Sequence, residues 1–189
     1  MPTANRPTDK RTRLIETAAR LTHERGFNRT SLADIAQDSG VPLGNVYYYF
    51  KTKHALGEAL VDRLAGMYES LCARWEADSD PRVRLEAFIQ MTVDNRETLA
   101  RSGCPIGTLC AELHKGGGPL ADHAATLFAE LLTWIETQFR AMGKGDESPE
   151  LAVHLLSAIE GASLLAHSFH NPRYVIQEAA RLVAWLRGL

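Results

Sequence analysis

One short segment of the sequence carries side chains that can recognise a nucleic acid. Residues Val41–Phe50 read V-P-L-G-N-V-Y-Y-Y-F. As a helix, this segment turns Val46 inward and leaves an outward set of Leu43, Gly44, Asn45, Tyr47, Tyr48 and Tyr49. An asparagine can bond an adenine edge through two hydrogen bonds, although many asparagines bond only phosphate. The tyrosines could instead be core aromatics, but one helix face cannot hold three consecutive residues, so at least one must face outward.

A second candidate for chemistry is Cys104, which directly precedes Pro105 and so stands at the start of a predicted helix. The positive end of a helix stabilises a thiolate and raises its reactivity. Our hypothesis is that Cys104 is a redox or electrophile switch, and the alternative is a small buried residue. An enzyme with Cys104 as nucleophile and His167 as base is a further alternative, but no third orienting group is evident. We therefore predict no catalytic residue.

The histidines and cysteines are too scattered to predict a metal site. A metal-responsive regulator would have to use His114, His123, His154, His167 or His170, of which only the last two lie close together, and no set of four ligands is evident. The three cysteines, at 72, 104 and 110, suit neither a disulfide framework nor a zinc site. We predict no metal, no cofactor and a reducing, cytoplasmic location.

Three helices are predicted to position the first candidate. The first covers about Asp9–Arg25 and stops at Gly26, as a C-terminal glycine should. The second begins at Ser31, which with Asp34 forms a variant of the capping box. Pro42 opens the third, which ends near Phe50. Two short helices around a glycine-containing turn have the proportions of a helix-turn-helix over residues 31–50.

The rest of the chain also reads as helix, so we predict an all-α fold. A long helix is expected over about Thr52–Ala77, and prolines 81, 105, 119, 149 and 172 mark further helix starts. Nothing alternates with period two, so no sheet is expected. The pattern predicts about nine helices, three in a small N-terminal head and six in a larger body.

Composition and charge narrow the class of protein. The chain has 189 residues, 45% of them hydrophobic and 23% charged, which favours a folded core. The sequence contains no unbroken run of 18 apolar residues, so no membrane span is predicted. The polar N-terminus predicts a flexible arm rather than a secretory signal. Residues 1–54 hold nine Lys and Arg against five acids, a charge of +4, which leaves −6 elsewhere. A basic head on an acidic body suggests a polyanionic partner for the head alone.

The segment T-S-L-A-D-I-A-Q-D-S-G-V-P-L-G-N-V-Y-Y-Y-F-K-T-K-H-A-L resembles the signature of the TetR family of regulators, and the match spans about Thr8–Tyr68. The resemblance implies base contacts from Leu43, Gly44, Asn45 and Tyr47. It implies phosphate contacts from Ser31, Tyr48, Tyr49 and Lys53. Leu43 departs from the polar or basic residue of many members and could touch a thymine methyl group. The Gly-Cys-Pro stretch ending at Pro105 is similar to one subgroup that includes electrophile and oxidant sensors.

The resemblance also implies a homodimer with a DNA-binding domain over 8–68 and a ligand-binding, dimerisation domain over 69–189. Helices over Pro149–His167 and Pro172–Arg187 would form the interface, or would bury their apolar faces only within their own chain. A small, mostly apolar inducer would release a repressor from a palindromic operator by moving the Thr52–Ala77 helix; an activator is the alternative. The expected pocket residues are Met67, Phe88, Met91, Cys104, Ile106, Leu109, Phe128, Leu131, Trp134, Ile135, His154 and His167, and Glu160 or a histidine could orient the ligand.

Overall fold

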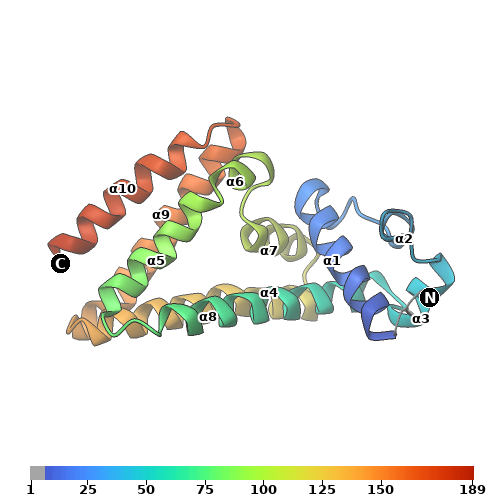
Figure 1. The fold of residues 1–189 in the computed structure, drawn as a ribbon, viewed down its shortest axis with the longest axis horizontal. Helices are drawn as coiled ribbons and strands as arrows, with labels where there is room; N and C mark the ends of the chain where they lie inside the picture. The colour runs from blue at the N-terminus through green and yellow to red at the C-terminus, as the bar shows by residue number, and fades with distance from the viewer. Residues whose placement is uncertain (1–6) are drawn as a thin grey trace, which may run out of the picture. The chain divides into compact units, whose positions relative to one another are not determined.

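The computed structural model describes residues 7–189, and side chains from Lys10 onward, so most of the predicted N-terminal arm lies outside the described part. Helices are the regular structure of this range and no strand occurs in it, which confirms the predicted all-α fold (Figure 1). In chain order the elements are α1 (Pro7–Arg25), α2 (Leu32–Ser39), α3 (Leu43–Tyr49), α4 (Lys53–Trp75), α5 (Pro81–Asp94), α6 (Arg96–Ser102), α7 (Pro105–Gly116), α8 (Pro119–Ala141), the 3-10 turn η1 (Gly145–Glu147), α9 (Ser148–Ser168) and α10 (Arg173–Gly188).

The prolines mark helix starts because they lack the amide hydrogen that the first turn leaves unused. Pro81 follows Asp80, whose carboxylate accepts a hydrogen bond from the Arg82 amide at 2.8 Å and so caps α5. The short helix α6 has no counterpart among the predicted helices. Its start at Asn95 has no proline, and the Asn95 side chain donates to the Met91 carbonyl instead of capping the helix.

The helices form two compact units. The first comprises the described residues of Met1–Ala65 together with Thr108–Ala125, and the second comprises Gly66–Gly107 and Thr126–Leu189. Three helices, α4, α7 and α8, each contribute residues to both units. The division into domains at residue 68 stays a prediction, and the packing places the second half of α7 with the N-terminal helices.

In the first unit, α2 packs against both α1 and α3. Its core is made of fully buried aliphatic and aromatic side chains, among them Leu14, Leu21, Ile35, Val46 and Leu56. An ion pair between Arg20 of α1 and Asp38 of α2 joins these two helices at the surface. Arg63 of α4 holds Glu16 of α1 through two hydrogen bonds of 2.8 and 2.6 Å, and this contact lowers the pKa of Glu16. The three N-terminal helices are therefore fixed to one another, and α1 is fixed to the middle of α4.

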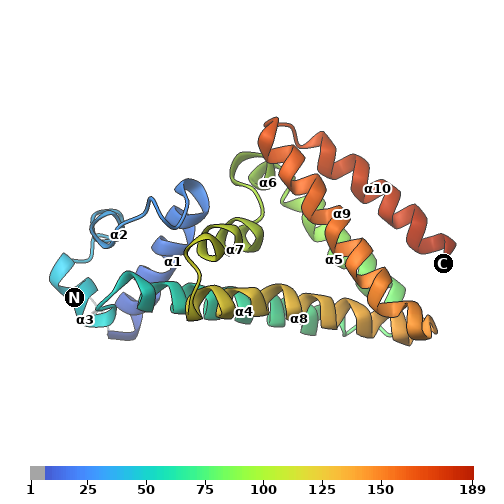
Figure 2. The same cartoon turned by 180° about the vertical axis from the view of Figure 1, so that it is seen from behind.

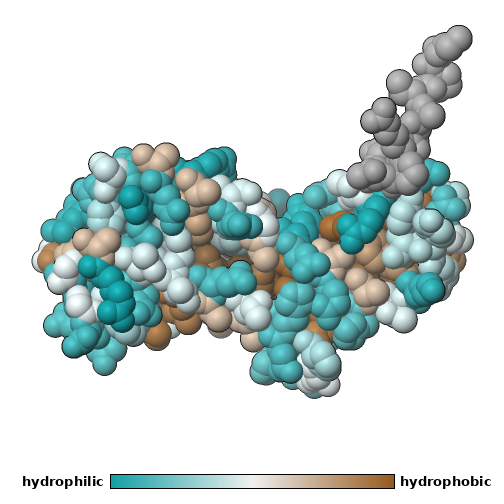
Figure 3. All heavy atoms as spheres, turned by 90° about the horizontal axis from the view of Figure 1, so that it is seen from below, coloured by the Kyte–Doolittle hydropathy of each residue, from teal (hydrophilic) through white to brown (hydrophobic). Residues whose placement is uncertain are grey.

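In the second unit, α10 packs against α9 and α5, while α6 packs against α9, as both ribbon views show (Figure 2). The stretch Gly145–Ser168 is long and apolar enough to cross a membrane by length and composition alone, a property that core helices share. This stretch is not an unbroken run of 18 apolar residues, because polar side chains interrupt it. On the face shown in Figure 3, hydrophilic side chains cover most of the surface and hydrophobic ones show between them.

Candidate nucleic-acid interface and ligand pocket

The predicted helix-turn-helix is formed by α2, a tight turn and α3. Ser31 caps α2: its hydroxyl accepts from the Asp34 amide at 3.1 Å, while the Asp34 carboxylate accepts from the Ser31 amide at 2.8 Å. The Ser31 hydroxyl also donates to the Asp34 carboxylate at 2.5 Å, and this bond, followed by the one from the Ser31 amide, lowers the pKa of Asp34. Gly40 ends α2 with a positive φ of 65°, which a residue with a side chain rarely adopts. The local sequence therefore builds this turn by itself.

The third helix is anchored by one side and presents the other. Val46 is fully buried, and Val41 and Phe50 on either side of the helix are buried as well. Leu43, Gly44, Tyr47 and Tyr48 are exposed, whereas Asn45 and Tyr49 are half-buried. No atom lies within 4 Å of the place where a Cβ would stand on Gly44. The structure thus exposes four of the six predicted outward residues and leaves Asn45 and Tyr49 half-buried, and the contacts of all six with DNA stay a prediction.

Lys53, at the start of α4, lies against the loop that precedes α2. Its ammonium donates to the Asn28 carbonyl oxygen at 3.0 Å and lies 4.8 Å from the centre of the Phe27 ring. Burial lowers the pKa of Lys53, and the nearby Glu112 and Asp34 carboxylates oppose this shift. Because Ser31 follows the same loop, the structure places two predicted phosphate contacts at its end.

Sequence reasoning missed one residue at this loop, Glu112 of α7. Its Oε2 accepts from the backbone amide of Asn28 at 2.8 Å, across a separation of 84 residues. No local pattern reports a contact between residues so far apart. A helix that was assigned to the body therefore contributes a carboxylate to the head.

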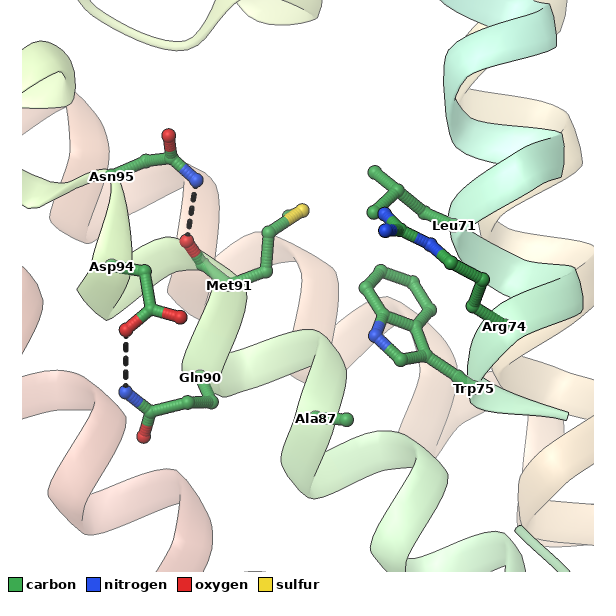
Figure 4. A pocket seen from close by; sticks show the side chains of 8 residues that line it. All are labelled: Leu71, Arg74, Trp75, Ala87, Gln90, Met91, Asp94 and Asn95. Carbon is green, nitrogen blue, oxygen red and sulfur yellow. Dashed lines mark hydrogen bonds between the residues drawn. The ribbon is translucent and has the colours of Figure 1, made fainter. Parts of the chain in front are cut away.

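A surface pocket of about 420 Å³ lies between the last turns of α4 and the helix α5 (Figure 4). Leu71, Arg74, Trp75, Ala87, Gln90, Met91, Asp94 and Asn95 line it. The Gln90 amide donates to the Asp94 carboxylate at 2.9 Å, and the Asn95 amide donates to the Met91 carbonyl at 2.8 Å. Figure 4 shows the Arg74 side chain beside Leu71 on the α4 side of the pocket. Within residues 7–189, its guanidinium donates no hydrogen bond to another group. A volume in this range can hold a small organic molecule.

Three of the predicted pocket residues gather at this place. Met91 lines the pocket itself. Phe88 and Trp134 pack with Trp75, whose ring centre lies 5.8 Å from that of Phe88 and 5.4 Å from that of Trp134. Trp75, which lines the pocket, thus packs against aromatic rings of α5 and α8. Trp75 was not among the predicted residues because nothing in the sequence separates it from other residues of the long helix.

The other predicted pocket residues are distributed over both units, and their part in ligand binding stays a prediction. Ile106, Leu109, Leu131 and Ile135 are buried, Phe128 and Cys104 are half-buried, and Met67 is exposed. Leu109 belongs to the first unit. His154 is exposed, with its ring 4.7 Å from that of Trp185. The ring centres of His167 and His170 lie 6.1 Å apart. The Nδ1 atom of His167 is buried without a hydrogen-bond partner in the described structure.

The expected stabilisation of a Cys104 thiolate is wrong. The start of α7 does act on the sulfur, since the Gly107 amide donates to Sγ at 3.4 Å. However, burial raises the pKa of Cys104 well above its ordinary value, and the neighbouring Glu160 raises it further. Burial raises the pKa of Glu160 as well. Desolvation of the thiolate therefore outweighs the local helix effect.

A histidine of α8 lies beside two acids of α4, and within the described residues they do not form a metal site. Nδ1 of His123, on α8, is in hydrogen-bond contact with Glu58, and its Nε2 lies 3.5 Å from Asp62, both acids being on α4. Among residues 7–189, no group of three or more His, Cys, Asp or Glu side chains has an arrangement that could hold a metal ion. The metal-responsive alternative thus finds no ligand set in this range.

Comparisons with known proteins place both parts of the chain. Residues 14–60 match the family model for bacterial regulatory proteins of the tetR family. Residues 81–180 match the model for the C-terminal domain of LmrA/YxaF-like transcriptional regulators.

Individual proteins are similar over most of their length. The chain is 31% identical over 163 residues to the uncharacterized HTH-type transcriptional regulator Rv0196 of Mycobacterium tuberculosis (strain ATCC 25618 / H37Rv), covering 82% of this chain and 83% of that one. It is 28% identical over 169 residues to the HTH-type transcriptional repressor DhaR of Mycobacterium sp. (strain GP1), covering 83% and 82%. A solved TetR-family regulator from Cytophaga hutchinsonii shares the fold with a TM-score of 0.83 and 21% identity, covering 100% of this chain and 98% of that chain.

Proposed function

The chain belongs to the TetR family of bacterial regulatory proteins, and we propose that it is a cytoplasmic, dimeric repressor that a small molecule releases from a palindromic operator. It is a helix-turn-helix transcriptional regulator that binds DNA. The observation that carries the proposal is the division of α3, in which Val46 is fully buried while Leu43, Gly44, Tyr47 and Tyr48 are exposed. An activator would use the same head, but a relative that is named as a repressor, DhaR, favours repression.

The proposed roles follow from side-chain chemistry and position. Asn45 and Tyr47 would bond base edges, Gly44 would let the backbone approach, and Leu43 would contact a thymine methyl group. Ser31, Tyr48, Tyr49 and Lys53 would bond phosphates and set the register of the head on the duplex. The amide end of α2 adds a positive partial charge beside Ser31.

Dimerisation is proposed through α9 and α10. Leu164 of α9 is 64% exposed, and Phe169, which directly follows this helix, is 63% exposed. Val153 and Leu165 of α9 and Ile176 of α10 are exposed as well. Such a concentration of large apolar side chains at the surface is typical of an interface. One reading helix contacts too few bases for specificity, so two heads about 34–36 Å apart would read two half-sites.

The pocket between α4 and α5 is the proposed inducer site. Leu71, Trp75 and Met91 offer an apolar and partly aromatic wall, while the Arg74 guanidinium offers hydrogen-bond donors and a positive charge. An aromatic molecule with an anionic or hydrogen-bond-accepting group fits this combination. The helix α4 begins at Lys53, a proposed phosphate contact, and ends at Trp75 in the pocket wall. A ligand that shifts this helix would therefore displace Lys53 and alter DNA binding by the head.

The enzyme alternative has no support. The family and the relatives are transcriptional regulators. The high pKa of Cys104 also disfavours the thiolate that a nucleophilic mechanism would need.

Selection of genomic DNA by the purified protein, followed by sizing of the complex on the best site, tests the proposal. We expect a palindromic site occupied by one dimer. Failure to enrich any sequence at low salt would contradict it, because even weak specific binding should then be detectable.

A further inference from the structure

The backbone of Asn28, in the loop between α1 and α2, is held from two directions. Its amide donates to the Glu112 carboxylate of α7 at 2.8 Å, and its carbonyl accepts from the Lys53 ammonium of α4 at 3.0 Å. The partners stand 84 and 25 residues away in the sequence. Two elements outside the helix-turn-helix therefore meet on one residue of the loop that leads into it.

This loop ends at the groups that are proposed to bind phosphate. Thr30 closes it by donating to the Gly26 carbonyl at 2.8 Å, and Ser31 then caps α2. Lys53 lies over the Phe27 ring and on the Asn28 carbonyl. A shift of Asn28 would thus displace both the lysine and the start of α2.

The loop fits closely around the Glu112 carboxylate. Gly26 adopts a φ of +92°, and a Cβ on it would lie only 2.5 Å from Glu112 Oε1. One carboxylate oxygen thus lies against Gly26 while the other bonds Asn28. The carboxylate is also close enough to Lys53 to interact with its charge. A hydrogen bond to a charged acceptor is stronger than one between neutral groups.

We propose that Glu112 is a positioning residue of the DNA-reading head, which holds the Asn28 loop so that Lys53 and Ser31 meet the DNA backbone. This inference rests on the proposed function of the head. The inference adds a way to regulate DNA binding. If α7 moved away from the Asn28 loop, the phosphate contacts would loosen although α7 itself need not touch α3. Position 112 lies outside the segment 14–60 that matches the family's N-terminal model.

Salt-dependent binding of the full-length protein to its selected operator tests this role. Glu112→Ala should weaken DNA binding about tenfold, the loss expected when the charge-assisted hydrogen bond between Lys53 and a phosphate is broken. It should also reduce the slope of log affinity against log salt by about one, because Lys53 leaves its phosphate. Asp122→Ala is the matched control, since it removes an exposed carboxylate from the same unit, and it should change neither quantity.

A double-mutant cycle with Lys53→Ala separates positioning from general destabilisation. In the Lys53→Ala background, Glu112→Ala should cost about twofold rather than tenfold and leave the salt slope unchanged. An equal loss in both backgrounds, or no loss in either, would overturn the proposal. If Glu112→Ala does not fold, the same cycle can be measured with Glu112→Gln, for which the expected loss of DNA affinity is smaller, about threefold. Failure of the unmodified protein to select DNA would instead contradict the proposed function itself.

Discussion

Val46 and Tyr48 stand two residues apart in α3, yet Val46 is fully buried and Tyr48 is 78% exposed. The helix is thus divided between an anchoring side and a presenting side within a single turn. Stability and DNA binding should depend on different residues of the same seven-residue helix.

Val46→Ala should therefore affect mainly stability, and Tyr48→Phe mainly operator binding. Val46→Ala removes two buried methyl groups and should lower the free energy of unfolding by about 2 kcal/mol. Tyr48→Phe removes only a surface hydroxyl, so the stability should change by less than about 0.5 kcal/mol. Its operator affinity should fall about fivefold through the loss of one phosphate hydrogen bond. Denaturant unfolding and binding titrations measure the two quantities, and a stability loss for Tyr48→Phe as large as that for Val46→Ala would refute the division.

Arg74 is expected to orient a ligand in the pocket between α4 and α5. We predict that 1-naphthoate quenches tryptophan fluorescence by binding beside Trp75, and that Arg74→Gln weakens this binding about tenfold through the lost charge-assisted hydrogen bond. Arg101→Gln, at an exposed arginine of α6, is the control and should bind as the unmodified protein does. Equal binding by all three proteins would remove Arg74 from the site.

Leu164 should matter for assembly because it is one of the most exposed large apolar side chains on α9. Leu164→Asp would place a charge in the proposed interface, and loss of the leucine burial alone costs about 1.5–3 kcal/mol per site. We expect sedimentation to show a shift from dimer to monomer. Val83→Asp, on the exposed surface of α5, should stay dimeric. A dimeric Leu164→Asp protein would place the interface elsewhere.

The cysteines of the second unit should react slowly. Burial raises the pKa of Cys72 to about 11, and it raises that of Cys104 well above its ordinary value. Because only the thiolate is alkylated, the iodoacetamide labelling of native Cys72 at pH 8 should be about 100-fold slower than in the unfolded chain. The rate should rise as the pH rises toward 11, the pKa of Cys72. Preferential labelling of Cys104 at neutral pH would restore the hypothesis of an electrophile switch.

The parts of the structure that could be predicted are those that the local sequence builds. Ser31, Gly40 and Pro42 act on their immediate neighbours, so the boundaries of α2 and α3 follow from the residues that form them. The prolines at 81, 105 and 119 start their helices for the same reason.

Contacts across long separations could not be predicted in this way. Glu112 reaches Asn28 across 84 residues, and Trp134 meets Trp75 through packing that no spacing rule describes. The reactivity of Cys104 shows the same limit. Its place at a helix start suggests a thiolate, but its burial beside Glu160 of α9 decides the opposite.

The central claim is that α3 reads bases while Lys53 binds the backbone. Competition between operator and random DNA, measured for Asn45→Ala and Lys53→Ala, tests it most directly. Asn45→Ala should lower the preference for the operator by about tenfold or more, since one bidentate base contact is worth about 1–3 kcal/mol, and should leave random DNA binding unchanged. Lys53→Ala should weaken both DNAs alike and reduce the salt slope by about one. Equal weakening of operator and random DNA by both variants would contradict the account.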